Sequence, residues 1–139
     1  MSRIINTETV GKERNRLLKG IVISIRELMK QSKPDEVTRD LAAFIALALE
    51  AVAATIDRTV TPWEKRDYWL KADRFRREWA WAEDFGQKMR ESVLAEDWPV
   101  VAGLTAQVGE KLSHIEVSPR HRMGTPWVGS WEKLRSSGE

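Results

Sequence analysis

The chain has 139 residues, which is the size of one domain and enough to bury roughly two thirds of its unfolded surface. It contains no cysteine, so disulfides, cysteine-ligated metals and thiol nucleophiles are excluded. Its 23 basic and 21 acidic residues nearly balance, which argues against a dedicated polyanion-binding protein.

Two helices are predicted before residue 60. The first should extend from about residue 9 to residue 31, and a Ser-Lys-Pro-Asp break places Pro34 near the start of the second. The second is apolar nearly all round, which indicates a position at the centre of the core. Its apolar run at 41–56 contains Glu50 and is too short for a membrane span, so no membrane insertion is expected.

A set of core positions follows from this helical periodicity. It comprises one stripe of the second helix and two aromatic residues further along the chain, all expected to be nearly fully buried. These residues are Leu41, Phe44, Ile45, Ala48, Leu49, Val52, Phe75 and Trp79.

A third helix is predicted from Thr61 to about residue 94. Thr61 has the side chain of an N-cap, Pro62 suits the first helical position, and Glu64 completes a capping box. Of the 21 residues from 64 to 84, 12 are charged, and the segment is also rich in tryptophan. A helix with this composition should both pack against the core and present a surface.

Its apolar side chains fall on two arcs when they are placed at 100° per residue. The wide arc contains Tyr68, Ala72, Phe75, Trp79, Ala82, Gly86, Met89 and Val93. The narrow arc contains Trp63, Leu70, Trp81 and Phe85. Trp69 belongs to neither arc and lies on the polar side of the helix, near Lys65, Arg66 and Arg76.

A fourth helix should begin near Trp98, with Pro99 in its first turn. The predicted connections between helices are short, which favours antiparallel neighbours. No segment shows the sustained alternation of a β-strand. The predicted fold is therefore all-α, an antiparallel up-and-down bundle of about four helices over residues 1–117.

Residues 118–139 form a separate, turn-rich tail with two tryptophans. Trp127 and Trp131 lie one helical turn apart, and each has a large apolar area to bury. We expect this tail to dock on the bundle or on a partner. Within one molecule, the expected receptor is the narrow arc, Trp63, Leu70, Trp81 and Phe85.

No arrangement of residues indicates catalysis. Glu110 and His114 share a helix face, but one such pair is far short of a metal site. His121 lies in the basic tail without the neighbours that nucleophilic catalysis requires, and there is no glycine-rich phosphate loop. The sequence therefore predicts no catalytic residue, no cofactor and no metal, in a protein that is not an enzyme.

The expected partner-binding surface combines aromatic and basic side chains. Residues 1–33 hold eight lysines and arginines against three acidic residues, so the N-terminal arm is distinctly basic. Trp69 is flanked by further basic residues. The residues expected to bind a partner are Trp69, Lys65, Arg66, Arg76, Arg3, Lys12, Arg14, Arg16, Trp127 and Trp131.

Two functions remain open on this basis. The first is a non-enzymatic helical interaction protein that binds a protein partner or a second copy of itself. The second is a small RNA- or DNA-associated subunit that uses the N-terminal arm and the Trp69 face. One continuous basic face joining the arm to Arg66 and Arg76 would favour nucleic acid. An exposed tryptophan among scattered charges would favour protein.

Several motifs resemble a family of small bacterial helical proteins of unknown activity. They are Ser2-Arg3-Ile4-Ile5-Asn6-Thr7 followed by Gly11-Lys12, Trp63-Glu64-Lys65-Arg66-Asp67-Tyr68-Trp69, and Arg74-Phe75-Arg76-Arg77-Glu78-Trp79. The similarity extends over most of the chain and implies a bacterial, cytoplasmic protein. It supplies no activity, cofactor or site residue. A cytoplasmic location is also compatible with the lack of cysteine and of an N-terminal apolar segment typical of secretory signals.

Overall fold

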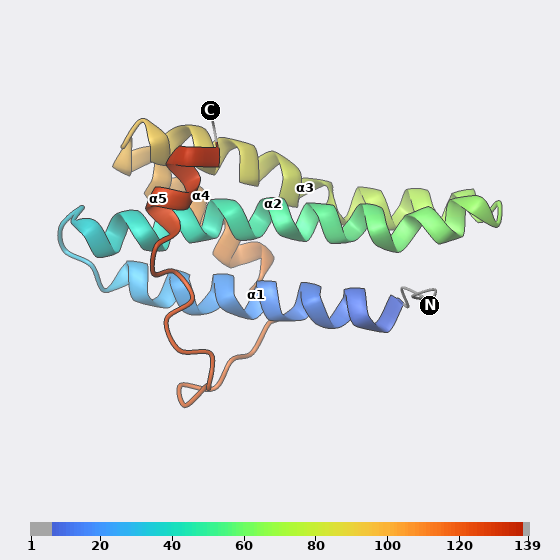
Figure 1. Ribbon diagram of the computed structural model, residues 1–139, viewed down its shortest axis with the longest axis horizontal. Helices are drawn as coiled ribbons and strands as arrows, with labels where there is room; N and C mark the ends of the chain where they lie inside the picture. Colours follow the sequence, from blue (N-terminus) through green and yellow to red (C-terminus); the bar gives the residue numbers. More distant parts are fainter. Residues whose placement is uncertain (1–6, 138–139) are drawn as a thin grey trace.

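The computed structural model describes residues 7–137, with side chains from residue 9 onward, and this part of the chain contains helices and no strand. The helices are α1 (Thr7–Met29), α2 (Glu36–Lys65), α3 (Trp69–Leu94), α4 (Trp98–Lys111) and α5 (Ser130–Ser137). The predicted all-α helical bundle is confirmed. Figure 1 shows α1, α2 and α3 as three long antiparallel rods with α2 in the middle.

The core lies around α2, as its nearly continuous apolar sequence predicts. Helix α2 packs against α1, α3 and α5, while α4 packs against α3 and α1. In Figure 1, α4 lies behind the half of the bundle that carries α5, so the other half consists of α1 and the α2–α3 hairpin. Leu41, Ile45 and Leu49 are fully inaccessible to solvent, and Ala48 and Val52 are also buried.

Three of the predicted core residues are only half-buried. Phe44 and Trp79 pack at the edge of the core, and Phe75 is partly buried outside it. The Phe44 ring packs against Gly20 of α1. A Cβ added to Gly20 would lie only 3.0 Å from an atom of that ring. The Arg14 guanidinium of α1 lies over the rings of Phe75 and Trp79 on α3. An amphipathic stripe predicts which side of the helix a side chain lies on, but it does not predict how completely other residues bury that side chain.

The predicted start of the third helix at Thr61 is wrong, because α2 continues to Lys65 with Pro62 inside it. The Thr61 hydroxyl donates to the carbonyl of Asp57, four residues earlier, as an interior threonine does. The same residues that resemble an N-cap therefore belong to the last turns of α2. Trp63 and Glu64 consequently lie on α2, and Tyr68 precedes α3.

The α2–α3 and α3–α4 turns use the same helix-ending motif. After α2, the Tyr68 N–H donates to the Trp63 carbonyl and the Asp67 N–H to the Glu64 carbonyl, at 2.8 and 3.1 Å. Asp67 has a left-handed backbone with φ of 63°. After α3, the equivalent bonds join Asp97 to Ser92 and Glu96 to Val93, with Glu96 at φ of 52°. These are Schellman motifs in which an acidic residue occupies the usual glycine position.

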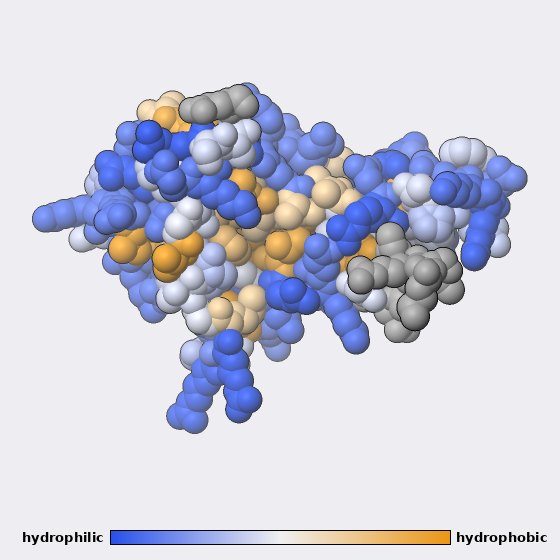
Figure 2. Space-filling model, in the orientation of Figure 1, coloured by the Kyte–Doolittle hydropathy of each residue, from blue (hydrophilic) through white to orange (hydrophobic). Residues whose placement is uncertain are grey.

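The tail docks on α2 through main-chain hydrogen bonds. The Asp40 carboxylate accepts from the N–H groups of Gly129 and Trp131, at 3.2 and 2.9 Å, and so caps the start of α5. Leu134 of α5 is fully buried. Figure 2 shows that hydrophobic side chains on this face gather over the middle of the bundle, beside the tail. Asp40 and Arg90 hold this tail by hydrogen bonds, and neither residue belongs to the narrow arc that was expected as its receptor.

Candidate interaction surface at the tip of the α2–α3 hairpin

The turn between α2 and α3 exposes three consecutive large apolar side chains. Asp67 has a left-handed backbone in this turn, and the three residues that follow it are exposed. Tyr68 is 51% exposed, Trp69 59% and Leu70 65%. The turn forms one end of the molecule in Figure 1, and pale side chains alternate with strongly hydrophilic ones at that end of Figure 2. This exposure costs free energy that a partner would recover.

A groove of about 620 Å³ lies beside these residues, and we refer to it as the tip groove. Its apolar lining comes from both helices and from the turn. The lining residues are Trp63, Tyr68, Trp69, Leu70 and Phe75, with Asp67, Lys71, Arg74 and Glu78 as the charged members. The tip groove is open and shallow, as expected of a surface that receives a side chain from another molecule rather than enclosing a substrate.

Aromatic packing fixes the wall of the tip groove. The Trp63 and Phe75 rings meet edge to face, with centroids 5.4 Å apart. The row continues along α3 through Trp79, Trp81 and Phe85, with neighbouring centroids 5.9 to 6.5 Å apart. Edge-to-face and offset pairs at these distances are favourable beyond their buried area. The wall is therefore held in place from the bundle, while Trp69 stands outside this row.

Arg76, which was expected to flank Trp69, is engaged on α2 instead. Its guanidinium donates to Glu64 at 3.2 Å and to Asp57 at 2.5 Å. Hydrogen bonds first to Glu64 and then to Asp57 raise the pKa of Arg76 above its usual value. Arg76 therefore ties α3 to α2.

Four other cations at the tip have no acidic partner among the described residues. Lys65 and Arg66 are exposed at the end of α2, and Arg74 is exposed on α3. The Lys71 ammonium lies over the Trp63 ring, 4.3 Å from its centroid, and makes no ion pair within residues 9–137. Of the expected site residues, Lys65, Arg66 and Trp69 all lie at the hairpin tip, and of these three Trp69 lines the tip groove.

The basic residues of the N-terminal arm differ in their surroundings. Arg3 lies outside the described residues, and Lys12 and Arg16 are exposed on α1. Arg14 is half-buried: its Nε donates to the Thr55 hydroxyl at 3.0 Å and its Nη2 to the Thr59 hydroxyl at 2.5 Å.

The contacts of Arg14 indicate a mainly structural role. Its guanidinium lies 5.1 Å from the centroid of the Phe75 ring and 5.9 Å from that of Trp79. Burial, and then the charge of Arg58, lower the pKa of Arg14. Arg58 itself pairs with Glu13 across α1 and α2. Arg14 thus joins α1 to both α2 and α3.

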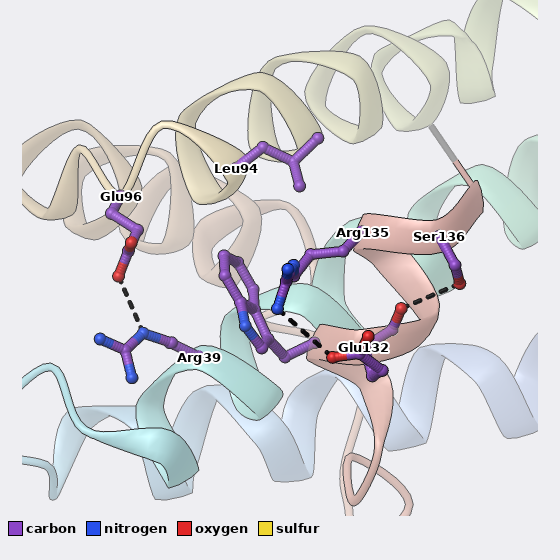
Figure 3. Close-up of a pocket in the computed structure, with 7 residues that line it drawn as sticks. Arg39, Leu94, Glu96, Glu132, Arg135 and Ser136 are labelled. Atoms are coloured by element: carbon purple, nitrogen blue, oxygen red, sulfur yellow. Dashed lines mark hydrogen bonds and ion pairs between the residues drawn. The ribbon is translucent and has the colours of Figure 1, made fainter. Parts of the chain in front are cut away.

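The tail tryptophans are half-buried and lie elsewhere. Trp131 lines a second groove of about 750 Å³ with six other residues. Figure 3 shows this groove, with Arg39 paired to Glu96 on one side and Arg135 paired to Glu132 on the other, at 2.8 and 3.4 Å. Its polar groups largely satisfy one another, and Trp127 and Trp131 do not join the tip groove.

Other candidate chemistry is sparse. His114 is exposed, and His121 Nδ1 accepts the Met123 N–H at 3.2 Å. Within residues 9–137, no group of three His, Asp or Glu side chains is placed to hold a metal. In the same part of the chain, no helix is long and apolar enough to cross a membrane.

Sequence reasoning missed Tyr68 and Leu70, which flank Trp69 at the tip. It placed them on apolar arcs of one helix that was expected to begin at Thr61. A usable signal existed, because no helical phase can bury three consecutive large side chains on one side. Comparison of the chain with protein-family models, curated proteins and solved structures found no match.

Proposed function

We propose that this protein is a non-enzymatic helical interaction protein that binds a protein partner through the tip groove. One observation carries the proposal: Tyr68, Trp69 and Leu70 are exposed together beside a wall formed by Trp63 and Phe75. Tryptophan and tyrosine dominate the binding energy of protein interfaces when a partner desolvates them. The preformed wall lowers the cost of ordering side chains on binding.

The distribution of charge supports a protein partner over nucleic acid. Arg76 is neutralised by Asp57 and Glu64, and Arg14 is enclosed by Thr55 and Thr59. Among the described residues, the cations that remain are distributed over α1, the end of α2 and α3, whereas a nucleic-acid backbone is bound best by one continuous basic face. Nucleic acid remains the competing partner, and a second copy of this chain is one form that the protein partner can take.

The proposal is tested by affinity capture from the lysate of the native cell, with and without nuclease. The test variant is Trp69→Ala. The matched control is Met29→Ala, which removes a side chain that is 79% exposed at the end of α1. We expect Trp69→Ala to abolish a nuclease-resistant protein interaction that Met29→Ala retains. Loss of the interaction on nuclease treatment would assign the surface to nucleic acid, and equal capture by both variants would exclude the tip groove.

Self-association is tested separately with purified protein. Light scattering over a range of concentrations gives the mass of the wild type and of Trp69→Ala. A dimer that becomes a monomer in Trp69→Ala would make a second copy the partner. An unchanged monomeric mass would require a different protein in that role.

A further inference from the structure

Around the hairpin tip, a larger share of the acidic residues than of the basic residues is engaged in ion pairs within the molecule. Asp57 and Glu64 both bind Arg76, and Asp73 binds Arg77 at 2.8 Å. Among the described residues, no ion pair engages Lys65, Arg66, Lys71 or Arg74, whereas Asp67 and Glu78 are the unengaged acids. Within the lining, Lys71 and Arg74 balance Asp67 and Glu78, and Lys65 and Arg66 at the end of α2 make the free charge near the tip groove positive.

Two of these cations, Lys71 and Arg74, line the tip groove, and the other two precede the turn. Lys65 and Arg66 lie at the end of α2, just before the turn, and Lys71 and Arg74 lie on the first turns of α3. Trp69 and Leu70 lie between the two pairs along the chain. An apolar side chain seated against Trp69 would therefore carry its flanking residues past basic groups.

We infer that the tip groove receives an acidic protein segment, in which one large apolar side chain is flanked by aspartate or glutamate. The inference rests on the proposed function and specifies the chemistry of its partner. The apolar residue would pack against Trp63, Trp69 and Phe75, and the carboxylates would pair with the free cations. Charge complementarity of this kind sets which partners bind and how fast they associate.

A nucleic-acid strand fits the same surface less well. Asp67 and Glu78 line the tip groove itself, where a strand with a phosphate at every nucleotide would bring negative charge against them but a peptide can place an uncharged residue. Apart from Lys71 and Arg74 the rest of the lining is aromatic or aliphatic, and it includes Leu70, which has no aromatic face for a base to stack upon. An acidic peptide can place its charges beside the basic border and its apolar residue in the lining.

The experiment selects short random peptides displayed on phage against the immobilised full-length protein. Selected peptides are synthesised with a fluorescent label, and their affinities are measured by anisotropy. The charge variant is Arg66→Glu/Arg74→Glu. The charge-matched control is Lys12→Glu/Arg16→Glu on α1, which changes the net charge equally and alters the arm that nucleic acid would use. Circular dichroism establishes that each variant is folded.

We expect the selected peptides to be acidic and to share a large apolar residue. Their affinity should fall about tenfold or more in Arg66→Glu/Arg74→Glu and in Trp69→Ala, and change little in the α1 control. Neutral or basic selected peptides, or no selected peptide that depends on Trp69, would overturn the inference. A labelled single-stranded oligonucleotide that binds more tightly than any peptide and weakens in both charge variants would assign the surface to nucleic acid.

The two proposals fail differently. If a protein is captured through Trp69 but its affinity is unchanged in Arg66→Glu/Arg74→Glu, the proposed function stands and the inference of an acidic partner is wrong. If Trp69→Ala leaves every interaction unchanged, the proposed function itself is wrong.

Discussion

The ammonium group of Lys71 lies 4.3 Å from the centroid of the Trp63 ring, so the first turn of α3 is joined to the last turn of α2 across the hairpin tip. A cation over a tryptophan face is attracted by the ring's negative potential. Together with the edge-to-face contact between Trp63 and Phe75, it fixes the wall of the tip groove from within the bundle. Trp69 has no part in this wall contact, so its side chain is available to a partner.

Trp69→Ala should leave the fold intact. Because Trp69 is largely exposed, its truncation should change the free energy of unfolding by about 0.5 kcal/mol or less. Leu49→Ala, at a fully buried position of α2, should cost about 2–5 kcal/mol. Urea denaturation of the two variants makes the comparison. A loss at Trp69 as large as that at Leu49 would mean that Trp69 supports the core rather than a partner.

Two glycine positions should respond in opposite directions to alanine. A Cβ on Gly86 of α3 would lie 3.3 Å from the backbone nitrogen of Glu50 on α2, which cannot move aside. Nothing lies within 4 Å of a Cβ on Gly103 of α4. Alanine favours a helix over glycine by about 1 kcal/mol, so Gly103→Ala should be stabilising and Gly86→Ala destabilising. Thermal denaturation tests this, and stabilisation by both variants would contradict the close α2–α3 contact.

Asp67→Gly should stabilise the protein. Asp67 holds a φ of 63°, and a left-handed conformation costs an ordinary residue roughly 1–2 kcal/mol but costs glycine little. The expected gain in the free energy of unfolding is about 1 kcal/mol. Asp67→Ala provides the comparison because it keeps a Cβ. If denaturant midpoints show no advantage of glycine over alanine, the turn has a different backbone from the one described.

The stability of the α2 N-terminus should depend on pH through Asp35. Its carboxylate accepts the Thr38 N–H at 3.1 Å, and that bond to the charged form lowers the pKa of Asp35 in the folded state. A lowered pKa contributes stability above the unfolded value of about 3.9, and the contribution disappears as pH falls through the folded value. Asp35→Asn keeps an N-cap side chain without this titration.

The wild type should therefore be more stable than Asp35→Asn at neutral pH, and its advantage should shrink below about pH 4. Guanidinium midpoints at neutral and acidic pH give the difference directly. An advantage that stays constant through the acid range would show that the Asp35 carboxylate does not act as a charged cap.

The helical fold was predictable because most of its signals are local. The buried positions of α3 from Ala72 to Val93 follow the predicted arc, and α4 begins at Trp98 with Pro99 as expected. The α2–α3 boundary was not predictable from capping residues, since Thr61 and Pro62 also fit inside a helix. Its actual marker is Asp67, which occupies a position where glycine is the usual signal.

The environment of each site residue depended on long-range contacts. Periodicity placed Trp69 correctly on no apolar arc, but it could not show that Arg76 reaches Asp57 and Glu64 or that Arg14 reaches Thr55. Similarly, Glu50 has no partner within its own helix and pairs with Arg90 of α3, at 2.7 Å. These partners lie 12 to 41 positions away in the chain, beyond any spacing rule for one helix.

Site-specific photocrosslinking tests the tip groove most directly. A benzophenone amino acid replaces Trp69 in one protein and Met29 in another, and each is irradiated in the native cell. We predict a discrete adduct with a polypeptide at position 69 that survives nuclease and is absent at position 29. No adduct at position 69, the same adducts at both positions, or an adduct that nuclease removes would contradict a protein-binding surface at the tip of the α2–α3 hairpin.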